Sequence, residues 1–120
     1  MSKHTPPMRD AKPVLPEGLT TRPLQKSDAG AVHRLMAAQE LEDIGQVAIE
    51  EADIVSDWAK PSHDLGARSI GVLDGDTLVG YAELMGVDRG DTAVLPSYRG
   101  RGIGTWLAHW LQDLDRKSVV

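Results

Sequence analysis

Residues 91–105 read DTAVLPSYRGRGIGT, and this stretch decides the fold. Its first part, residues 92–95, is β-branched and apolar, which predicts a short strand. Pro96 ends that strand, because proline has no N–H to give to a sheet ladder. Glycine then occupies three alternate positions in residues 100–104, so backbone N–H groups can turn toward one side without an intervening Cβ.

An amphipathic helix follows the glycines. Its apolar residues fall at i, i+4, i+7, i+8 and i+11, which is one face of a helical period, and they are Ile103, Leu107, Trp110, Leu111 and Leu114. The first N–H groups of a helix lack internal partners and carry partial positive charge. A strand, a glycine bend and a helix start therefore predict an anion site, to which Arg99 and Arg101 add planar cationic groups suited to phosphate.

Two familiar phosphate motifs are excluded by missing residues. No Gly-Lys-Ser/Thr follows the glycines, and their spacing is Gly-x-Gly-x-Gly rather than the Gly-x-Gly-x-x-Gly of dinucleotide sites. The stretch instead resembles the acetyl-CoA signature of the GNAT superfamily of N-acetyltransferases, Val-x-Pro-x-x-Arg-Gly-x-Gly-x-Gly. The fixed positions are filled by Val94, Pro96, Arg99, Gly100, Gly102 and Gly104.

The resemblance implies a set of residues for acetyl-CoA as co-substrate. Its pyrophosphate would lie on the N–H groups of residues 100–105, and the backbone N–H of Val94 would face the thioester carbonyl and stabilise the developing oxyanion. The residues expected to bind the coenzyme are Val94, Arg99, Gly100, Arg101, Gly102, Ile103, Gly104 and Thr105.

Composition limits the remaining possibilities. The chain has 120 residues, 41% hydrophobic and 26% charged, as expected for one globular domain. It has no cysteine, which excludes disulfides and thiolate chemistry and fits a reducing compartment. The net charge of -5 argues against a nucleic-acid or anionic-membrane partner. The four histidines do not have the spacing of metal ligands. The sequence has no apolar run long enough to span a membrane and no signal peptide, so we expect a cytoplasmic protein.

The rest of the chain predicts the remaining elements. Residues 1–16, with four prolines, read as a flexible N-terminal extension, and residues 17–120 as the domain. We expect a strand at 18–24, helices from 28 to about 39 and from 50 to Pro61, a hairpin of strands 68–73 and 77–84 around Asp74-Gly75-Asp76, and a turn at 86–90. In the second helix Ile54, Val55 and Trp58 are expected to be buried.

The order of these elements predicts an α/β (α+β) fold. By resemblance it is a GNAT-like mixed, mostly antiparallel sheet flanked by helices. A further parallel strand expected after the last helix is not found before Val120, so we expect the domain to be incomplete at its C-terminus, as a truncated copy or one completed by another chain. An unpaired strand edge after Leu95 would allow a homo-oligomer.

Alternation along the second hairpin strand predicts its two faces. Leu78, Gly80, Ala82 and Leu84 are expected on one face, with Val79, Tyr81, Glu83 and Met85 on the other. This places Glu83 among apolar neighbours, where partial burial would raise its pKa.

Acetyl transfer requires a base, because a free amine is mostly protonated at neutral pH. Glu83 is the first candidate and Asp91 the second, while Asp88 lies near the position where some family members place their base. Tyr81 and Tyr98 do not match the family's thiol-protonating tyrosine.

Residues 40–59 contain seven acids and no Lys or Arg. These acids either form a solvated face or attract a cationic amine.

The predicted function is N-acetyltransferase activity, with an acetyl group moving from acetyl-CoA to a primary amine of a small molecule or a peptide by direct attack. The alternative is a non-catalytic acyl-CoA-binding or interaction module that keeps only the phosphate bend. A third interpretation, nucleic-acid binding through the Arg-Gly stretch, predicts salt-sensitive affinity.

Overall fold

The structure, a computed structural model, describes residues 14–85 and 89–118. The strands are β1 (Leu19–Arg22), β2 (Ser69–Asp74), β3 (Thr77–Met85) and β4 (Arg89–Val94). The α-helices are α1 (Ala29–Ile44), α2 (Glu51–Trp58), α3 (Leu65–Arg68) and α4 (Ile103–Ser118). The 3-10 turn η2 (Lys26–Asp28) precedes α1, and the 3-10 turn η3 (Pro96–Tyr98) follows β4.

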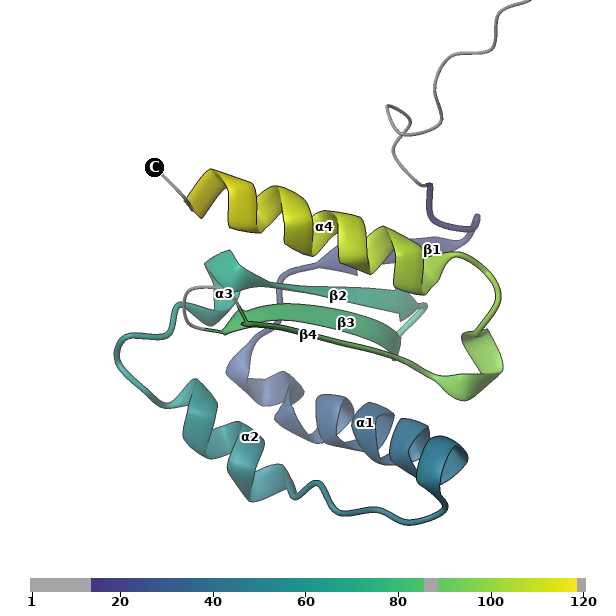
Figure 1. The fold of residues 1–120 in the computed structure, drawn as a ribbon, viewed down its shortest axis with the longest axis horizontal. Helices are drawn as coiled ribbons and strands as arrows, with labels where there is room; N and C mark the ends of the chain where they lie inside the picture. Colours follow the sequence, from purple (N-terminus) through teal and green to yellow (C-terminus); the bar gives the residue numbers. More distant parts are fainter. Residues whose placement is uncertain (1–13, 86–88, 119–120) are drawn as a thin grey trace, which may run out of the picture.

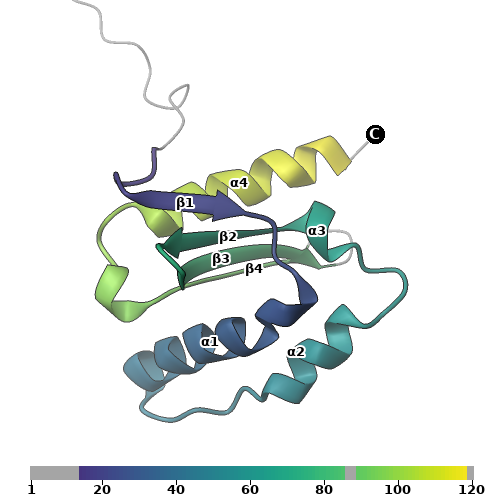
Figure 2. The ribbon, with the colours of Figure 1, turned by 180° about the vertical axis from the view of Figure 1, so that it is seen from behind.

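The strands form one antiparallel sheet in the order β1-β2-β3-β4. Helices α1 and α2 cover one face and α4 covers the other, so the sheet is the middle of three layers (Figure 1; Figure 2 from behind). The predicted α+β fold with a mostly antiparallel sheet flanked by helices is confirmed. In the described part of the chain β1 and β4 are the two edges. Pro23, which has no N–H to give to a ladder, directly follows β1.

Each face of the sheet has its own hydrophobic cluster. The cluster beneath α1 and α2 includes Val32, Leu35, Ile54, Trp58, Leu78, Tyr81 and Ala93. The cluster beneath α4 includes Ile70, Val72, Val79, Ala82, Ile103 and Leu107, with Trp106 and Trp110 packed against it. The predicted apolar face of α4 therefore packs on the sheet. Because β3 contributes to both clusters, its two faces are held by different helices.

A β-bulge in β3 overturns part of the predicted face assignment. Val72 pairs with Gly80 and Leu73 pairs with Leu78, so Val79 is an extra residue on β3. The bulge turns Leu78 toward α1 and Val79 toward α4. The alternation predicted for both residues is therefore wrong, because a bulge changes the phase of the side chains. Beyond the bulge Tyr81 and Ala82 face opposite helices, as predicted.

Three further expectations need correction. Helix α1 runs past the predicted end to Ile44, where Gly45 adopts a left-handed conformation and ends it. Gly90 lies within β4 rather than in a turn, because the strand starts at Arg89. Val55 is 50% exposed, since the short α2 presents only Ile54 and Trp58 to the core.

Some expectations fall on residues outside the described ranges. They concern residues 1–13 of the predicted extension, and residues 86–88 of the predicted turn, which include Asp88. Within residues 14–85 and 89–118, no helix combines the length and apolar character needed to cross a membrane.

Candidate active site

The glycine bend leaves the start of α4 open. Gly100 and Gly102 have φ angles of +78° and +88°, a conformation that other residues rarely adopt. A Cβ built on either glycine would meet no other atom within 4 Å, so the bend is not packed against protein on that side. The N–H of Trp106 donates to Gly102 O at 3.0 Å. The N–H groups of residues 103–105 have no acceptor within the helix, which leaves them for an anion.

A cavity of about 310 Å³ lies against this bend. It is lined by Gln39, Val94, Tyr98, Arg99, Gly100, Gly102, Ile103, Gly104 and Thr105. A Cβ on Gly104 would lie 3.9 Å from Val94 Cγ2, an ordinary contact, so the fold would accept a side chain there. The glycine instead keeps this part of the cavity free. The space, the N–H groups and the nearby arginines fit a diphosphate, and we call this site the cradle.

The two arginines beside the bend differ in their partners. Arg99 makes a bidentate ion pair with Asp43 of α1, with Nη1–Oδ1 and Nη2–Oδ2 distances of 2.9 and 3.0 Å. Arg101 stacks over the ring of Tyr98, with Cζ 4.7 Å from the ring centroid. Tyr98 Oη donates to Asp74 Oδ2 at 2.5 Å, which ties η3 to the end of β2. Arg99 is thus engaged by α1, whereas Arg101 is held by an aromatic face.

The backbone N–H of Val94 also has a partner from α1. It donates to Gln39 Oε1 at 3.0 Å. The neighbouring N–H of Leu95, one residue past the end of β4, donates to Val79 O at 2.8 Å. Since successive N–H groups of a strand point to opposite sides, that of Val94 is directed away from β3. The N–H predicted to face a thioester carbonyl therefore meets an amide carbonyl oxygen in this structure.

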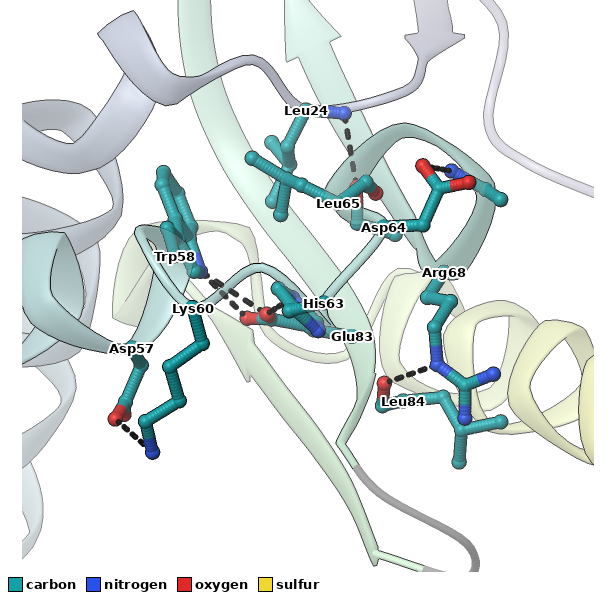
Figure 3. Close-up of polar contacts among 12 residues, drawn as sticks. Leu24, Asp57, Trp58, Lys60, His63, Asp64, Leu65, Arg68, Glu83 and Leu84 are labelled. Carbon is teal, nitrogen blue, oxygen red and sulfur yellow. Dashed lines mark hydrogen bonds and ion pairs between the residues drawn. The ribbon is translucent and has the colours of Figure 1, made fainter.

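Glu83 lies buried on β3 in a polar cluster with Trp58 and His63 (Figure 3). Trp58 Nε1 donates to both carboxylate oxygens, at 3.2 and 3.0 Å, and His63 Nε2 lies 2.6 Å from Oε2. The Glu83 and His63 side chains are only 5% and 8% exposed. Trp58 ends α2 and His63 lies in the loop before α3, so two elements fix one carboxylate.

Burial is the main influence on the pKa of Glu83. Desolvation raises the pKa of Glu83, the hydrogen bonds from Trp58 and His63 oppose that rise, and the charge of Asp91 adds to it. Burial likewise raises the pKa of Tyr81, whose Oη donates to Met36 Sδ at 3.4 Å. Glu83 is therefore a carboxyl group with the raised pKa that a general base needs.

Glu83 and Asp91 both line a second cavity, of about 100 Å³, on the α1 and α2 side of the sheet. Its other lining residues are Val32, Met36, Ile49, Asp53, Ile54, Asp57, Trp58, Tyr81, Met85 and Arg89. Four carboxylates thus surround a small, partly apolar space, which we call the acidic pocket. Val94 follows Asp91 by three residues on β4, a distance of about 10 Å along a strand.

The structure brings together most of the predicted residues, in two groups. Seven of the eight residues predicted to bind the coenzyme line the cradle, and Arg101 is held beside it by Tyr98. Both predicted bases line the acidic pocket. Among the described residues, no group of three or more potential ligands is placed to hold a metal.

Three polar residues of these sites, Trp58, His63 and Gln39, were not predicted from the sequence. Trp58 was expected only to fill the core, and nothing in the spacing of His63 or Gln39 marks them. The one sequence feature that pointed to such partners was a glutamate on a strand among apolar neighbours. A buried carboxylate requires hydrogen-bond donors, which must then come from elsewhere in the chain.

Comparison with known families agrees with the geometry. Residues 31–118 match the sequence model of the acetyltransferase (GNAT) family. No curated protein sequence matches the chain.

Similar solved structures are acetyltransferases. A GCN5-related N-acetyltransferase from Sphaerobacter thermophilus has a TM-score of 0.77 at 27% identity, over 87% of this chain and 34% of that one. YncA, a putative acetyltransferase from Salmonella typhimurium solved with acetyl-CoA, has a TM-score of 0.66 at 18% identity, over 85% and 65%. The spermidine N-acetyltransferase SpeG from Vibrio cholerae has a TM-score of 0.56 at 19% identity, over 83% and 63%. The chain thus spans between about a third and two-thirds of these proteins, and the latter two similarities concern the fold alone.

Proposed function

Because the chain belongs to the GNAT acetyltransferase family, we propose that it transfers an acetyl group from acetyl-CoA to a primary amine by direct attack. The observation that carries this proposal is the buried Glu83 carboxylate, which lines an acidic pocket beside the strand that leads into the cradle. One face of β3 and β4 thereby supplies the base, and the end of β4 supplies the coenzyme site.

The cradle is the proposed binding site of the coenzyme. The N–H groups of residues 100–105 would hold its diphosphate, with Arg99 and Arg101 as the cationic partners. Acetyl-CoA supplies an acyl group activated as a thioester, whose transfer to a neutral amine forms an amide and releases the thiol. The N–H of Val94 is available to a carbonyl oxygen once Gln39 moves, and a fixed backbone donor of this kind stabilises developing negative charge.

Glu83 is the proposed general base. It takes one proton from the amine, which must be neutral to attack. Trp58 and His63 keep the carboxylate in one orientation, and their hydrogen bonds limit how far burial raises its pKa. Asp91, at the rim of the same pocket, is more exposed and is the second candidate.

The proposed acceptor is a cationic amine. Asp53, Asp57 and Asp91 line the acidic pocket with Glu83, and carboxylates of one sign raise the local concentration of an ammonium ion. A space of about 100 Å³ accommodates an aminoalkyl end rather than a bulky ring system. SpeG, a spermidine N-acetyltransferase of similar fold, supports a polyamine as the first acceptor to test.

A thiol-release assay tests this function. Acetyl-CoA binding is measured first by isothermal titration calorimetry, and turnover is then measured with spermidine, a monoamine and a neutral alcohol. We expect binding, and thiol release with the amines only. Binding without turnover for any amine would instead support the non-catalytic coenzyme-binding module, and absence of binding would contradict both functions.

A further inference from the structure

The cradle lies where β4 leads through η3 into α4 (Figure 1). Side chains from the C-terminal half of α1 contact its polar groups. Gln39 and Asp43 are four residues apart, so they project from one face of the helix. Gln39 Oε1 accepts the N–H of Val94 at 3.0 Å, and Asp43 holds the guanidinium of Arg99 through two contacts of 2.9 and 3.0 Å. One helix face thereby contacts two groups that the coenzyme would use.

Each of these contacts has the chemistry of a coenzyme group. The amide oxygen of Gln39 is a carbonyl acceptor, like the carbonyl groups of an acyl-pantetheine arm. The Asp43 carboxylate presents two anionic oxygens to a planar guanidinium fork, as a phosphate does. The partners are separated by 55 and 56 residues in the chain, so tertiary packing rather than local geometry makes both contacts.

We propose that Gln39 and Asp43 are part of the coenzyme site and act as internal competitors. They satisfy the N–H of Val94 and the guanidinium of Arg99 in the free protein, and both contacts are exchanged for coenzyme groups on binding. This inference rests on the proposed function, because it requires the cradle to bind coenzyme A.

The exposure of the ion pair makes such an exchange feasible. The side chains of Arg99 and Asp43 are 42% and 49% exposed, and exposed ion pairs contribute little net stability. A diphosphate offers Arg99 more negative charge than one carboxylate does. At Val94 the hydrogen bond to Gln39 is exchanged for an equally neutral hydrogen bond to a carbonyl of the coenzyme. The contacts from α1 therefore lower the affinity for the coenzyme but do not prevent it from binding.

A different role for Asp43 predicts the opposite result. If Asp43 orients Arg99 toward the phosphate, then removing its charge weakens binding. If Asp43 competes with the phosphate, then removing its charge strengthens binding. The sign of the change in affinity therefore separates the two roles.

The experiment measures the Kd for coenzyme A by isothermal titration calorimetry at low salt. The variants are Asp43→Asn, Arg99→Gln, the double variant and Gln39→Ala, each checked for folding by urea denaturation. The matched control is Asp113→Asn, which removes the carboxylate of another exposed pair, with Arg116 at 2.9 Å. Asp113 follows Ile103 by ten residues on α4, or about 15 Å along the helix.

We expect Asp43→Asn to bind coenzyme A about two- to fivefold more tightly than the wild type, as the loss of an exposed competitor predicts. Asp113→Asn should bind as the wild type does. In the Arg99→Gln background the effect of Asp43→Asn should disappear, because the two residues then have no interaction to lose. Gln39→Ala should also bind more tightly.

Other outcomes overturn the inference. If the wild type binds coenzyme A and Asp43→Asn binds it equally well or more weakly, Asp43 is not a competitor. The proposed function would remain intact. If Asp113→Asn gains as much affinity for coenzyme A as Asp43→Asn does, the gain results from the change in net charge and the competitor role is rejected. If neither the wild type nor Asp43→Asn binds coenzyme A, the proposed function fails and this inference fails with it.

Discussion

Asp91 is the cross-strand partner of Glu83 in the antiparallel pair of β3 and β4. The two carboxylates line the same pocket, one buried and one at its rim. Burial is the main cause of the raised pKa of Glu83, and the like charge of Asp91 raises it further. The sheet register therefore contributes to the protonation of the proposed base.

This pairing predicts the effect of Asp91→Asn on the pH profile. Removing the like charge lowers the pKa of Glu83, so the carboxylate ionises at lower pH. We expect the ascending limb of kcat/KM against pH to move to lower pH, with the fold unchanged. The measurement is thiol release across the pH range, and a limb that moves upward would contradict the role assigned to Asp91.

Trp58→Phe should shift the same limb in the opposite direction. The indole N–H donates to both oxygens of Glu83 and so favours the charged carboxylate. Phenylalanine keeps most of the buried ring but cannot donate, which raises the pKa of Glu83. We expect the ascending limb of kcat/KM to move to higher pH. Opposite shifts in Trp58→Phe and Asp91→Asn would assign the limb to Glu83, and equal shifts would exclude that assignment.

Glu83→Gln tests the base itself. The amide has the size of the carboxylate and can still accept from Trp58, but it takes no proton from an amine. We expect kcat to fall about 10²- to 10⁴-fold, the usual contribution of a general base. The Kd for acetyl-CoA, measured by calorimetry, should stay within about twofold, because Glu83 lies outside the cradle. Full activity in this variant would show that Glu83 is not the general base and that Asp91 or another group is.

The raised pKa of Glu83 also predicts how stability depends on pH. The folded protein binds this proton more tightly than the unfolded chain does. Between the ordinary pKa of glutamate and the raised pKa in the fold, the native state holds more protons. The contribution of Glu83 to the free energy of unfolding therefore falls as pH rises through this window and is constant above it.

Urea denaturation across this pH window checks that sign. The wild type should lose stability relative to Glu83→Gln as pH increases, since glutamine does not titrate. Comparing the two variants removes the contribution of the other ionisable groups, provided both unfold in two states. A difference in stability that grows in favour of the wild type as pH rises would show that the carboxylate is stabilised in the fold.

Gly104→Glu should separate folding from coenzyme binding. The position is helical and has room for a Cβ, and glycine is a poor helix former, so stability should rise by about 0.5–1 kcal/mol. The new carboxylate projects into the cradle and repels a diphosphate, so the Kd for coenzyme A should weaken by at least about tenfold. Gln112→Glu, exposed two turns further along α4, adds the same charge and should bind normally. Normal binding by Gly104→Glu would place the phosphate elsewhere.

The elements that could be predicted are those whose signal is local. Asp74-Gly75-Asp76 between apolar runs predicts the hairpin, and the apolar period after Gly102 predicts α4, because each depends on near neighbours in sequence. The cradle was predictable for the same reason, since one continuous segment contains the strand end, the bend and the helix start.

The remaining features depend on tertiary contacts. The hydrogen bonds of Trp58 and His63 to Glu83 join α2 and its following loop to a central strand, and no spacing rule links them. The same holds for Gln39 on α1 and Val94 on β4. The bulge at Val79 reverses the predicted faces, since both apolar residues at 78 and 79 can be buried on either side of the sheet.

The bulge at Val79 also has a consequence for how this chain tolerates length changes. Its carbonyl oxygen accepts the N–H of Leu95, so the extra residue sets where the glycine-bearing segment meets the sheet. Deleting Val79 would make the hairpin of β2 and β3 regular, but residues 80–85 would keep their pairing with residues 89–94, so Glu83 would stay opposite Asp91. The deletion would instead remove a buried side chain from the cluster beneath α4 and the carbonyl that anchors the segment after β4. A single-codon loss outside both sites would thus loosen the entry to the cradle while sparing the register of the proposed base.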